Sequence, residues 1–396
     1  MTKLISVDEA LAALMPHALD AGEETIPVGA ALGRVLAQNV LAKTTTPPTD
    51  VSAMDGYAVR LSDAQEAGNR LHVTGEIPAG TVPTHRLAAG EAIRIFTGAP
   101  LPEGADHILI QEEAHRTGDV IEVTTPQTSS RHIRKAGRDF AEGDVLVPPG
   151  KWLSPADLGL AAAGNNSTVT VSRRPVIAII PGGDELLPPG SELSPGKIID
   201  SNSTALAALI HTWGGEPVTP GIAGDTIEDI RALIDASSEA DLILPIGGAS
   251  VGDYDYMKTA FEGAGAEILF SGIAVRPGKP TWFARKGQQR ILGLPGNPAS
   301  AFVCAHLFLK ALLSKTAGPA GHFSARLETD MPAGGFRETY YRAVMRRTDG
   351  TYSVTPLPDQ DSSLLRPLQA ANCLIRRQPN APAANVGEDV ECVGLT

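Results

Sequence analysis

The stretch that decides the fold of this 396-residue chain is VIAIIPGGDE at residues 176–185. Five apolar residues run without interruption into a proline, two glycines and two acids. Two further stretches repeat this design, DLILPIGGASVGDYD at residues 241–255 and RILGLPGNPAS at residues 290–300. Continuous apolar runs of this kind are typical of strands that are buried on both faces of a parallel sheet. The sequence therefore predicts three such strands, each ending in a glycine-rich loop.

Helical stretches separate these strands along the chain. Residues 203–214 (STALAALIHTWG) and 226–237 (TIEDIRALIDAS) lie between the first and the second strand, and residues 298–313 (PASAFVCAHLFLKALL) follow the third. Alternation of buried strands and helices indicates βαβ units, because a parallel strand pair needs a crossover connection. We therefore expect a doubly wound α/β domain over residues 174–318.

The flanking regions have a different pattern. Short alternating runs such as LHVTGEI (residues 71–77) predict a β-rich domain over residues 46–140. The same pattern predicts a small β domain over residues 319–396. A capping box at Ser6 and Glu9, and helical spacing in ALGRVLAQNVLA (residues 31–42), predict helices near the N-terminus. We expect residues 1–45 and 141–173 to form a helical and mixed linker domain together.

Composition is typical of a soluble globular protein and disfavours two function classes. Apolar residues make up 42% of the chain and charged residues 20%. The net charge of −12 argues against nucleic-acid binding, which needs a basic face to neutralise phosphates. No apolar run reaches the ~18 residues of a membrane span and no signal sequence is evident, so we expect a cytoplasmic protein that binds no membrane. The three cysteines are far apart, which argues against a thiolate metal site, and Cys304 lies in an apolar run typical of a core.

The three glycine-rich loops are candidates for ligand binding. In an open α/β sheet, ligands bind beyond the carboxyl ends of the strands. Bare backbone can approach a ligand there, and free N–H groups attract phosphate. Each loop alone is compatible with simple turn chemistry, but three at one edge of a sheet favour a binding site. Carboxylates concentrate in the same region and are of the type that holds Mg²⁺ beside a phosphate: Asp184, Glu185, Asp225, Asp253 and Asp255.

Two further segments carry polar groups that suit an anionic ligand. Asp200-Ser201-Asn202-Ser203 precedes the first helical stretch; one of these residues is expected to cap the helix and the others to contact a ligand. The segment RPGKP (residues 276–280) places two cations three residues apart on a stiff loop. A solvated turn would also explain that loop, but an anionic substrate on a chain of net charge −12 needs local cations. We therefore expect Arg276 and Lys279 to form an oxyanion clamp.

Seven motifs, in their order along the chain, resemble the molybdopterin molybdenumtransferases, the family of MoeA and the gephyrin E-domain. They are SAMDGYA (52–58), RIFTGAPLP (94–102), GDEL (183–186), DSNS (200–203), GGASVGDYD (247–255), RPGKP (276–280) and GLPGNPASAF (293–302). The pattern of the first two, taken alone, is that of ordinary strand and turn segments. The resemblance covers nearly the whole chain, from ALGRVLA near residue 31 to QAAN near residue 369, and its motifs are specific.

The resemblance implies a fold, a reaction and an assembly. The fold is α/β plus β and multidomain: an elongated subunit with a doubly wound α/β molybdopterin-binding domain, a β-rich insertion domain and a small C-terminal β-barrel-like domain. In the reaction, adenylylated molybdopterin and molybdate give the molybdenum cofactor and AMP, with Mg²⁺ assisting. The assembly is a homodimer whose active cleft lies between the α/β domain of one subunit and the β domain of the other. The molybdopterin adenylyltransferase is a further partner that the resemblance allows.

The matching motifs imply functional positions in this chain. The catalytic positions are Asp55, Thr97, Glu185, Asp225, Asp255 and Lys279, of which Glu185, Asp225 and Asp255 are the candidate metal ligands. The ligand-binding positions are Gly183, Asp184, Asp200, Ser201, Asn202, Ser203, Gly247, Gly248, Ser250, Arg276, Pro295, Gly296, Asn297, Pro298 and Ser300. Arg337 and Ser362, in the last domain, match a molybdate-contacting pair more loosely.

Two loops depart from the family's pattern. Many relatives have Ser-Thr-Gly where this chain has Pro181-Gly182-Gly183, and hydroxyl residues where it has Pro245 and Ile246. Hydroxyl donors are therefore missing from two loops that are expected to face the pterin. An alternative to the transferase is thus a paralogue or scaffold that binds the pterin without efficient turnover. A generic nucleotide or sugar-phosphate transferase would rest on fold analogy only.

Overall fold

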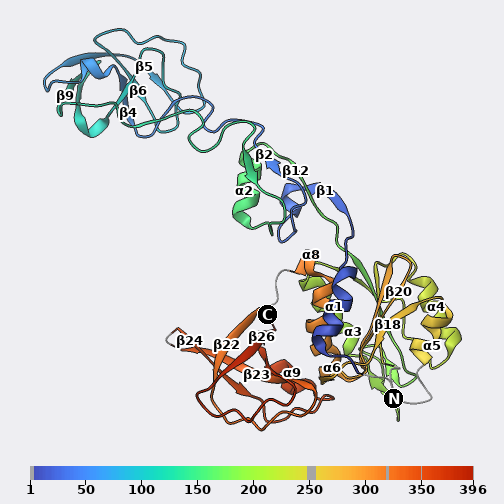
Figure 1. The fold of residues 1–396 in the computed structure, drawn as a ribbon. Helices are drawn as coiled ribbons and strands as arrows, with labels where there is room; N and C mark the ends of the chain where they lie inside the picture. Colours follow the sequence, from blue (N-terminus) through green and yellow to red (C-terminus); the bar gives the residue numbers. More distant parts are fainter. Residues whose placement is uncertain (1–3, 248–255, 318–320, 349, 396) are drawn as a thin grey trace. The chain divides into compact units, whose positions relative to one another are not determined.

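The computed structural model describes residues 4–247, 256–317, 321–348 and 350–395 (Figure 1). The chain forms two compact units. The first consists of Met1–Glu23 and Ser172–Thr396, and the second of Glu24–Val171. The first unit contains the predicted α/β domain and the predicted C-terminal β domain. The finer division of the chain into four domains stays a prediction.

A six-stranded mixed sheet forms the centre of the α/β part of the first unit. In order across the sheet, its strands are β16 (Glu216–Val218), β13 (Val176–Pro181), β17 (Leu242–Ile246), β21 (Gln289–Gly293), β20 (Trp282–Lys286) and β18 (Glu267–Ser271). The first four are parallel, whereas β20 pairs antiparallel with both β21 and β18. The three strands predicted from the apolar runs, β13, β17 and β21, are therefore neighbours. The antiparallel edge, which the sequence pattern did not predict, makes the sheet mixed.

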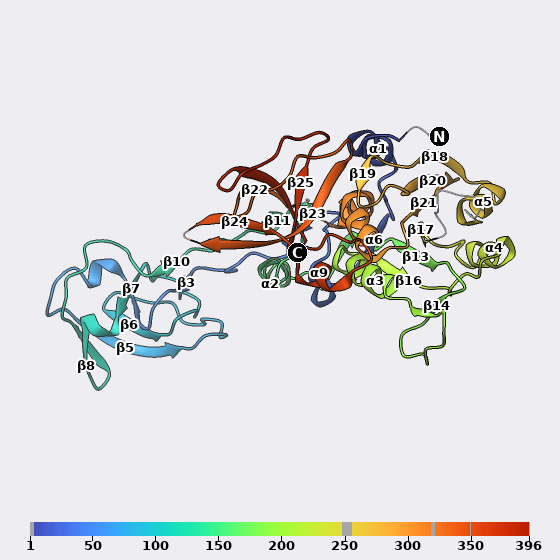
Figure 2. The ribbon, with the colours of Figure 1, turned by 90° about the horizontal axis from the view of Figure 1, so that it is seen from below.

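Helices cover both faces of this sheet, as a doubly wound fold requires (Figure 2). On one face lie α3 (Asn202–Thr212), α6 (Pro298–Cys304), the π-helical turn η5 (Ala305–Leu309) and α7 (Lys310–Leu312), and on the other α4 (Ile227–Ala236) and α5 (Tyr256–Gly263). Successive residues of β13 alternate between the two layers. Ile177 and Ile179 are buried in one core, and Ala178 and Ile180 in the other. The uninterrupted apolar run of this strand thus serves two cores.

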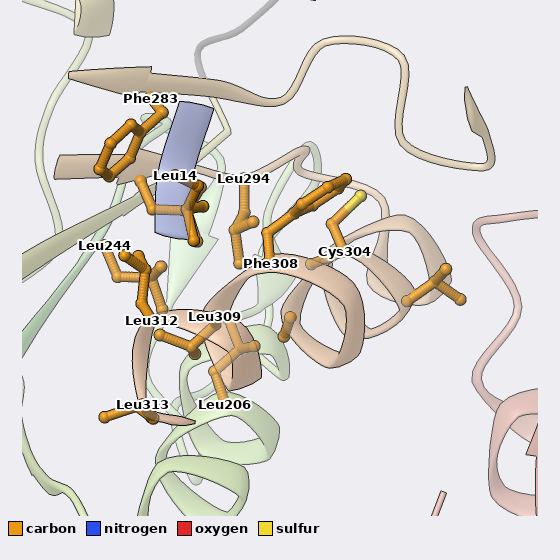
Figure 3. Packing of buried hydrophobic residues seen from close by; sticks show 14 of the residues in the cluster. Leu14, Leu206, Leu244, Phe283, Leu294, Cys304, Phe308, Leu309, Leu312 and Leu313 are labelled. Carbon is orange, nitrogen blue, oxygen red and sulfur yellow. The ribbon is translucent and has the colours of Figure 1, made fainter. Parts of the chain in front are cut away.

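The N-terminal helix α1 (Val7–Leu14) belongs to the α/β core. Its predicted capping box is present: the Ser6 hydroxyl accepts the Glu9 N–H at 3.1 Å, and the Glu9 carboxylate accepts the Ser6 N–H at 2.7 Å. Leu14 is fully buried in the same cluster as Phe283 and Leu312 (Figure 3). The structure therefore places this helix with the α/β core and not with residues 141–173, because its apolar face packs there.

The second helical stretch, expected at residues 31–42, is not a helix. The structure has a 3₁₀ turn at Val28–Ala30 and a short strand, β2 (Val40–Leu41), which pairs antiparallel with β11 (Val145–Val147). The Leu36 N–H donates to the carbonyl of Lys151 at 2.9 Å. Long-range backbone pairing has overridden the helical spacing, because it buries the same apolar side chains in a core of their own.

The second unit contains a six-stranded sheet that curls around two small cores. In order across the sheet, its strands are β7 (His107–Ile110), β4 (Gly56–Val59), β6 (Glu91–Ile95), β5 (Arg70–Ile77), β9 (Val120–Val123) and β8 (Ala114–Thr117). The cores are built around Ile121 and Ile93. Near the linker to the first unit, β1 (Glu23–Pro27) pairs with β12 (Thr168–Ser172), and α2 (Pro155–Ala163) begins with a second capping box at Ser154. The predicted β-rich region is confirmed.

The C-terminal part of the first unit is a closed five-stranded barrel. Its strands, in order around the barrel, are β23 (Glu338–Thr348), β24 (Thr351–Pro356), β22 (His322–Leu327), β26 (Asp389–Gly394) and β25 (Cys373–Arg377). Pairing of β25 with β23 closes it. A short strand, β19 (Val275–Arg276), pairs with the start of β23 and so joins the barrel to the α/β part. The described helices are all too short or too polar to cross a membrane.

Candidate active site

The described residues of the three glycine-rich loops, which include only Gly247 of the second loop, meet at one edge of the mixed sheet. The Gly182 N–H donates to the Ile246 carbonyl at 3.0 Å, and the Gly247 N–H donates to the Leu294 carbonyl at 3.1 Å. Gly247 has φ +81°, and a Cβ built on it would lie 3.0 Å from the Gly182 carbonyl oxygen. A Cβ on Gly296 would lie 3.4 Å from the Gly247 Cα. Position 247 therefore favours glycine, because its φ is positive and the Gly182 backbone lies close to it, whereas a Cβ on residue 296 would make an ordinary contact.

These loops form the wall of a cleft of about 730 Å³. The predicted positions that line it are Glu185, Asp200, Ser201, Asn202, Gly247, Pro295, Gly296, Asn297, Pro298 and Ser300. Pro181, Gly182 and Ile246, from the two loops that depart from the family's pattern, line it too. Gly183 and Asp184 were expected beside the ligand but are not among the lining residues. The cleft wall is thus mostly backbone, proline and small side chains.

The residues of the segment before α3, expected to cap the helix or to contact a ligand, have different positions in the structure. One carboxylate oxygen of Asp200 accepts the Ser203 N–H at 3.1 Å, so Asp200 caps the helix. The Asn202 side chain donates to the Gly296 carbonyl at 2.7 Å and fixes the start of α3 to the third glycine-rich loop. Ser201 faces the cleft. Ser203 is buried and does not line it.

A second pocket, of about 430 Å³, adjoins the cleft and shares Pro280 and Ser300 with it. Three cationic side chains line this pocket: Arg276 and Lys279 from the RPGKP loop, and Arg337 from the residue before β23. Ser362 lies on the opposite loop of the barrel. The structure therefore brings Arg337 and Ser362, the two loosely matched positions, together with the predicted oxyanion clamp.

The buried side chains of Cys304 and Thr281 pack against the RPGKP loop at Gly278. Gly278 has φ +123°, and a Cβ built on it would lie 2.2 Å from the Cys304 Sγ. The Thr281 hydroxyl donates to the Gly278 carbonyl at 2.8 Å and also lies 3.2 Å from the same sulfur. Cys304 is fully buried, as predicted, and burial raises the pKa of its thiol to about 12. This cysteine is thus a packing residue that fixes Lys279 indirectly.

The barrel wall of the pocket is joined to the cleft by Ser362. The Asn297 side chain donates to the Ser362 hydroxyl at 3.0 Å. The Ala299 N–H donates to the Ser362 carbonyl at 2.9 Å. A residue of the barrel is therefore bonded to the third glycine-rich loop at the boundary of the two hollows.

The candidate metal ligands are only partly brought together. Asp184 and Asp225 face each other: each carboxylate accepts the backbone N–H of the other residue, at 3.2 and 3.4 Å. Glu185 lines the cleft and folds back over Gly183. Lys197 donates to the Asp184 carbonyl. Within the described residues, no three His, Cys, Asp or Glu side chains are close enough together to hold a metal ion. Three predicted positions, Gly248, Ser250 and Asp255, lie outside the described residues.

The second unit holds the remaining two predicted positions. The backbone N–H and the hydroxyl of Thr97 both donate to the same carboxylate oxygen of Asp55, each at 2.8 Å. These bonds hold the pKa of the Asp55 carboxyl below its usual value, chiefly through the backbone N–H. The two motifs SAMDGYA and RIFTGAPLP are therefore paired in space, although they are about 40 residues apart in sequence.

Next to this pair lies a hollow of about 640 Å³ whose lining residues were not predicted from the sequence. It is lined by Gly98 and by Arg134, Arg138 and Asp139, among others. The stretch RKAGRDF (residues 134–140) lies at the end of the predicted β-rich domain and holds no predicted site residue. Its two arginines flanking a glycine were the one available signal, because neither lies at a predicted strand end.

Comparison with protein families accounts for nearly the whole chain. Residues 5–164 match the MoeA N-terminal region (domain I and II), residues 178–315 match a probable molybdopterin-binding domain, and residues 324–395 match the MoeA C-terminal region (domain IV). The three matches follow one another in this order along the chain.

Individual relatives are similar over most of their length. A molybdopterin molybdenumtransferase from Nostoc sp. is 36% identical over 349 residues, which is 84% of this chain and 80% of that protein. A molybdopterin molybdenumtransferase 2 from Mycobacterium tuberculosis is 34% identical over 94% of this chain and 95% of its own. The crystal structure of the molybdopterin biosynthesis MoeA protein from Pyrococcus horikosii has a TM-score of 0.87 and 30% identity, with 100% of both chains covered.

Proposed function

We propose, because this chain belongs to the MoeA family of molybdopterin molybdenumtransferases, that it inserts molybdate into adenylylated molybdopterin and releases AMP. One observation carries the proposal. A pocket lined by three cationic side chains opens directly beside a glycine-lined cleft, and the two share Pro280 and Ser300. A small oxyanion and a larger planar ligand can therefore lie next to each other.

The cationic pocket is the proposed molybdate site. Arg276 and Arg337 offer planar guanidinium groups, and Lys279 offers a point charge, which suits a tetrahedral dianion. The chain as a whole carries a net charge of −12, so this local concentration of positive charge has to overcome an unfavourable field. Ser362 and Ser300 add hydroxyl groups at the pocket wall.

The cleft is the proposed site of the pterin and its pyrophosphate. Its wall allows close approach because Gly247 and Gly296 carry no side chain. Asn202 and Asn297 are held in place by hydrogen bonds across the cleft edge, which orients the loops without occupying the space. The reacting dithiolene belongs to the substrate, so the chain needs no cysteine ligand, and the buried Cys304 thiol is not offered to the pocket.

We propose Mg²⁺ as the assisting ion, held by Glu185 and Asp225. Carboxylate oxygens are the type of ligand that Mg²⁺ takes, and water and substrate phosphates complete its shell. Asp225 is oriented by its bond from the Asp184 N–H, and Glu185 lines the cleft. Asp255 is the third proposed ligand. When bound, Mg²⁺ stabilises the charge that develops as the phosphoanhydride breaks.

We further propose a homodimer in which Asp55 and Thr97 of one subunit complete the cleft of the other. The bond from Thr97 keeps Asp55 ionised and oriented for such a role. Mixing Asp55→Asn subunits with Lys279→Ala subunits tests this: hybrid dimers then contain one intact shared site and should recover up to about a quarter of the wild-type activity after random exchange. No recovery in verified hybrids would contradict a shared cleft. A cytoplasmic location and docking of the molybdopterin adenylyltransferase complete the proposal.

The experiment that tests the function uses purified protein with adenylylated molybdopterin, molybdate and Mg²⁺. We expect release of AMP and formation of cofactor that reconstitutes an apo-molybdoenzyme. Chelation of divalent cations should stop AMP release, and Mg²⁺ should restore it. Tight pterin binding without AMP release would instead favour the second candidate, a pterin-binding paralogue or scaffold. That candidate is favoured by one observation: Pro181 and Ile246 give the cleft apolar walls where relatives offer hydroxyl groups.

A further inference from the structure

A buried arginine lies behind the barrel wall of the cationic pocket. Arg342, on β23, is only 1% exposed and is among the largest fully buried side chains of the described residues. It does not line the pocket itself. Burial lowers the pKa of its guanidinium, against the attraction of the Asp359 and Asp361 carboxylates, but an arginine stays charged in a protein. Burial of a charge is unfavourable in free energy unless the group is hydrogen-bonded, so the partners of Arg342 indicate its structural role.

The partners of Arg342 are the backbone carbonyls of one loop. Its guanidinium donates to the carbonyl of Asp361 at 2.9 Å, and at longer range to those of Asp359 (3.4 Å) and Leu364 (3.5 Å). The loop between β24 and α9 (Leu365–Ala370) is therefore gathered around a single side chain. This loop carries Ser362.

Gln360 completes the attachment of the loop to the strand. Its side-chain oxygen accepts the backbone N–H of Arg342 at 3.0 Å and the guanidinium Nε at 3.3 Å. Its amide group donates to the carbonyls of Arg342 at 2.9 Å and Leu357 at 2.8 Å. Every hydrogen-bonding direction of this amide is used between strand and loop.

The loop is also ordered internally. The Asp359 carboxylate accepts the Asp361 N–H at 2.9 Å, and the Asp361 carboxylate accepts the N–H and the hydroxyl of Ser363 at 2.9 and 2.7 Å. The Asp361 carboxylate thus has partners within its own loop, although it lines a pocket meant for an anion. Ser362, between these turns, is left to bond with Asn297.

We propose that Arg342 is a positioning residue for the oxyanion pocket, and that it acts through Gln360 and the loop 359–364 to hold Ser362 in the pocket wall, beside Asn297 and Ala299. The proposal rests on the proposed function of the pocket as the molybdate site. Arg342 does not line the pocket, so the proposed role is an indirect one. Its guanidinium also places a fixed positive charge behind the pocket wall, which adds to the field of the three lining cations.

The test compares Arg342→Met, which keeps length but loses charge and donors, with Arg342→Lys, which keeps charge but loses the planar fork. Molybdate affinity is measured by calorimetry with molybdate alone, and KM and kcat by AMP release. We expect Arg342→Met to raise the KM for molybdate about tenfold or more, as expected for lost charge-assisted bonds, with pterin affinity and kcat at saturating molybdate little changed. Arg342→Lys should fall between Arg342→Met and wild type.

Val354→Ala is the matched control, because Val354 is fully buried in the core of the same barrel and does not line either hollow. It should lower the melting temperature and leave the KM for molybdate unchanged. Gln360→Met keeps the proposal testable if Arg342→Met fails to fold, and should raise the KM in the same way. An unchanged molybdate KM in folded Arg342→Met or Gln360→Met would overturn the positioning role. Absence of AMP release by the wild type would instead reject the proposed function, and calorimetry with molybdate would still report on the loop.

Discussion

The two adjoining hollows of the first unit are built on opposite principles. The pocket of about 430 Å³ is defined by side chains, because its chemistry comes from Arg276, Lys279 and Arg337. In the cleft of about 730 Å³, glycines and prolines form much of the wall, and the close approach of Gly247 to Gly182 leaves little room for added side chains there. The pocket should therefore be sensitive to removal of a group, and the cleft to addition of one.

The hollows also differ in where their parts come from. The cleft is made mainly by the ends of neighbouring strands and the start of α3, and Ser363 and Leu365 of the barrel part complete its wall. The pocket needs two parts of the chain, the RPGKP loop and the barrel, which are joined by the pairing of β19 with β23. If a variant in one hollow weakens only molybdate or only the pterin, the two hollows are separate sites. If it weakens both ligands equally, they are not.

Removal of the lysine charge should have the largest effect. Lys279→Ala takes away one of the three cationic side chains that line the pocket. We expect AMP release at subsaturating molybdate to fall about a hundredfold, as for loss of a preorganised charged donor. Pterin affinity, measured by fluorescence quenching, should change less than about threefold.

Lys286→Ala is the control for that variant. Lys286 ends β20 and lines neither hollow. Its removal changes the net charge by the same amount and should leave AMP release unchanged. If Lys279→Ala weakened pterin and molybdate equally, the separation of the two sites would be wrong.

The second prediction concerns the support of the RPGKP loop. Gly278→Ala forces a side chain into φ +123° and places its Cβ 2.2 Å from the Cys304 Sγ. We expect a loss of about 2–4 kcal/mol in the free energy of unfolding, from backbone strain and overpacking together. Urea denaturation measures it, and molybdate binding should weaken with it.

The double variant Gly278→Ala/Cys304→Ala separates the two causes. Removal of the sulfur gives the new methyl group room but does not relieve the backbone. The double variant should therefore be more stable than the sum of the single effects predicts, by about 1–2 kcal/mol. Strict additivity would mean that the clash is not the cause.

The residue patterns predicted the strand ends at the cleft, but not the contacts that support the pocket, for a physical reason. The apolar runs before Gly182, Gly247 and Pro295 encode strands, and parallel strands bring their carboxyl ends together automatically. Contacts such as Arg342 with the loop 359–364, or Cys304 beneath Gly278, depend on tertiary packing that no local pattern reports. For the same reason, residues 31–42 have helical spacing but form no helix. The sequence also did not show that α1 packs against the α/β core. The roles assigned to individual site residues stay predictions.

Addition of a methyl group to the cleft is the third prediction. Gly247→Ala requires φ +81° and puts a Cβ 3.0 Å from the Gly182 carbonyl oxygen, so the loop has to shift. We expect pterin affinity to fall about tenfold, from about 1–2 kcal/mol of strain at the cleft wall, while the calorimetric affinity for molybdate stays unchanged.

A glycine elsewhere in the chain gives the matched control. Gly287 lies in the turn between β20 and β21, also has positive φ (+59°), and has nothing within 4 Å of a built Cβ. Gly287→Ala should cost about 1 kcal/mol of stability from the backbone alone and leave both affinities as in the wild type. A loss of pterin affinity in this control would show that general destabilisation, and not the cleft wall, explains Gly247→Ala.

The smallest expected effect lies at the boundary between the hollows. The Asn297 side chain lines the cleft and donates to the hydroxyl of Ser362, which lines the pocket, at 3.0 Å. Asn297→Ala should weaken molybdate and pterin by only about two- to fivefold each, because one neutral hydrogen bond contributes about 0.5–1.5 kcal/mol. In a double-mutant cycle with Ser362→Ala, the two losses of molybdate affinity should fall short of additivity by a similar amount, since both variants remove the same bond. Additive losses of molybdate affinity would mean that the bond between Asn297 and Ser362 does not couple the two sites, although they share a wall. If the combined loss of molybdate affinity is smaller than the sum, Asn297 and Ser362 are energetically coupled, and their bond links the barrel to the cleft wall.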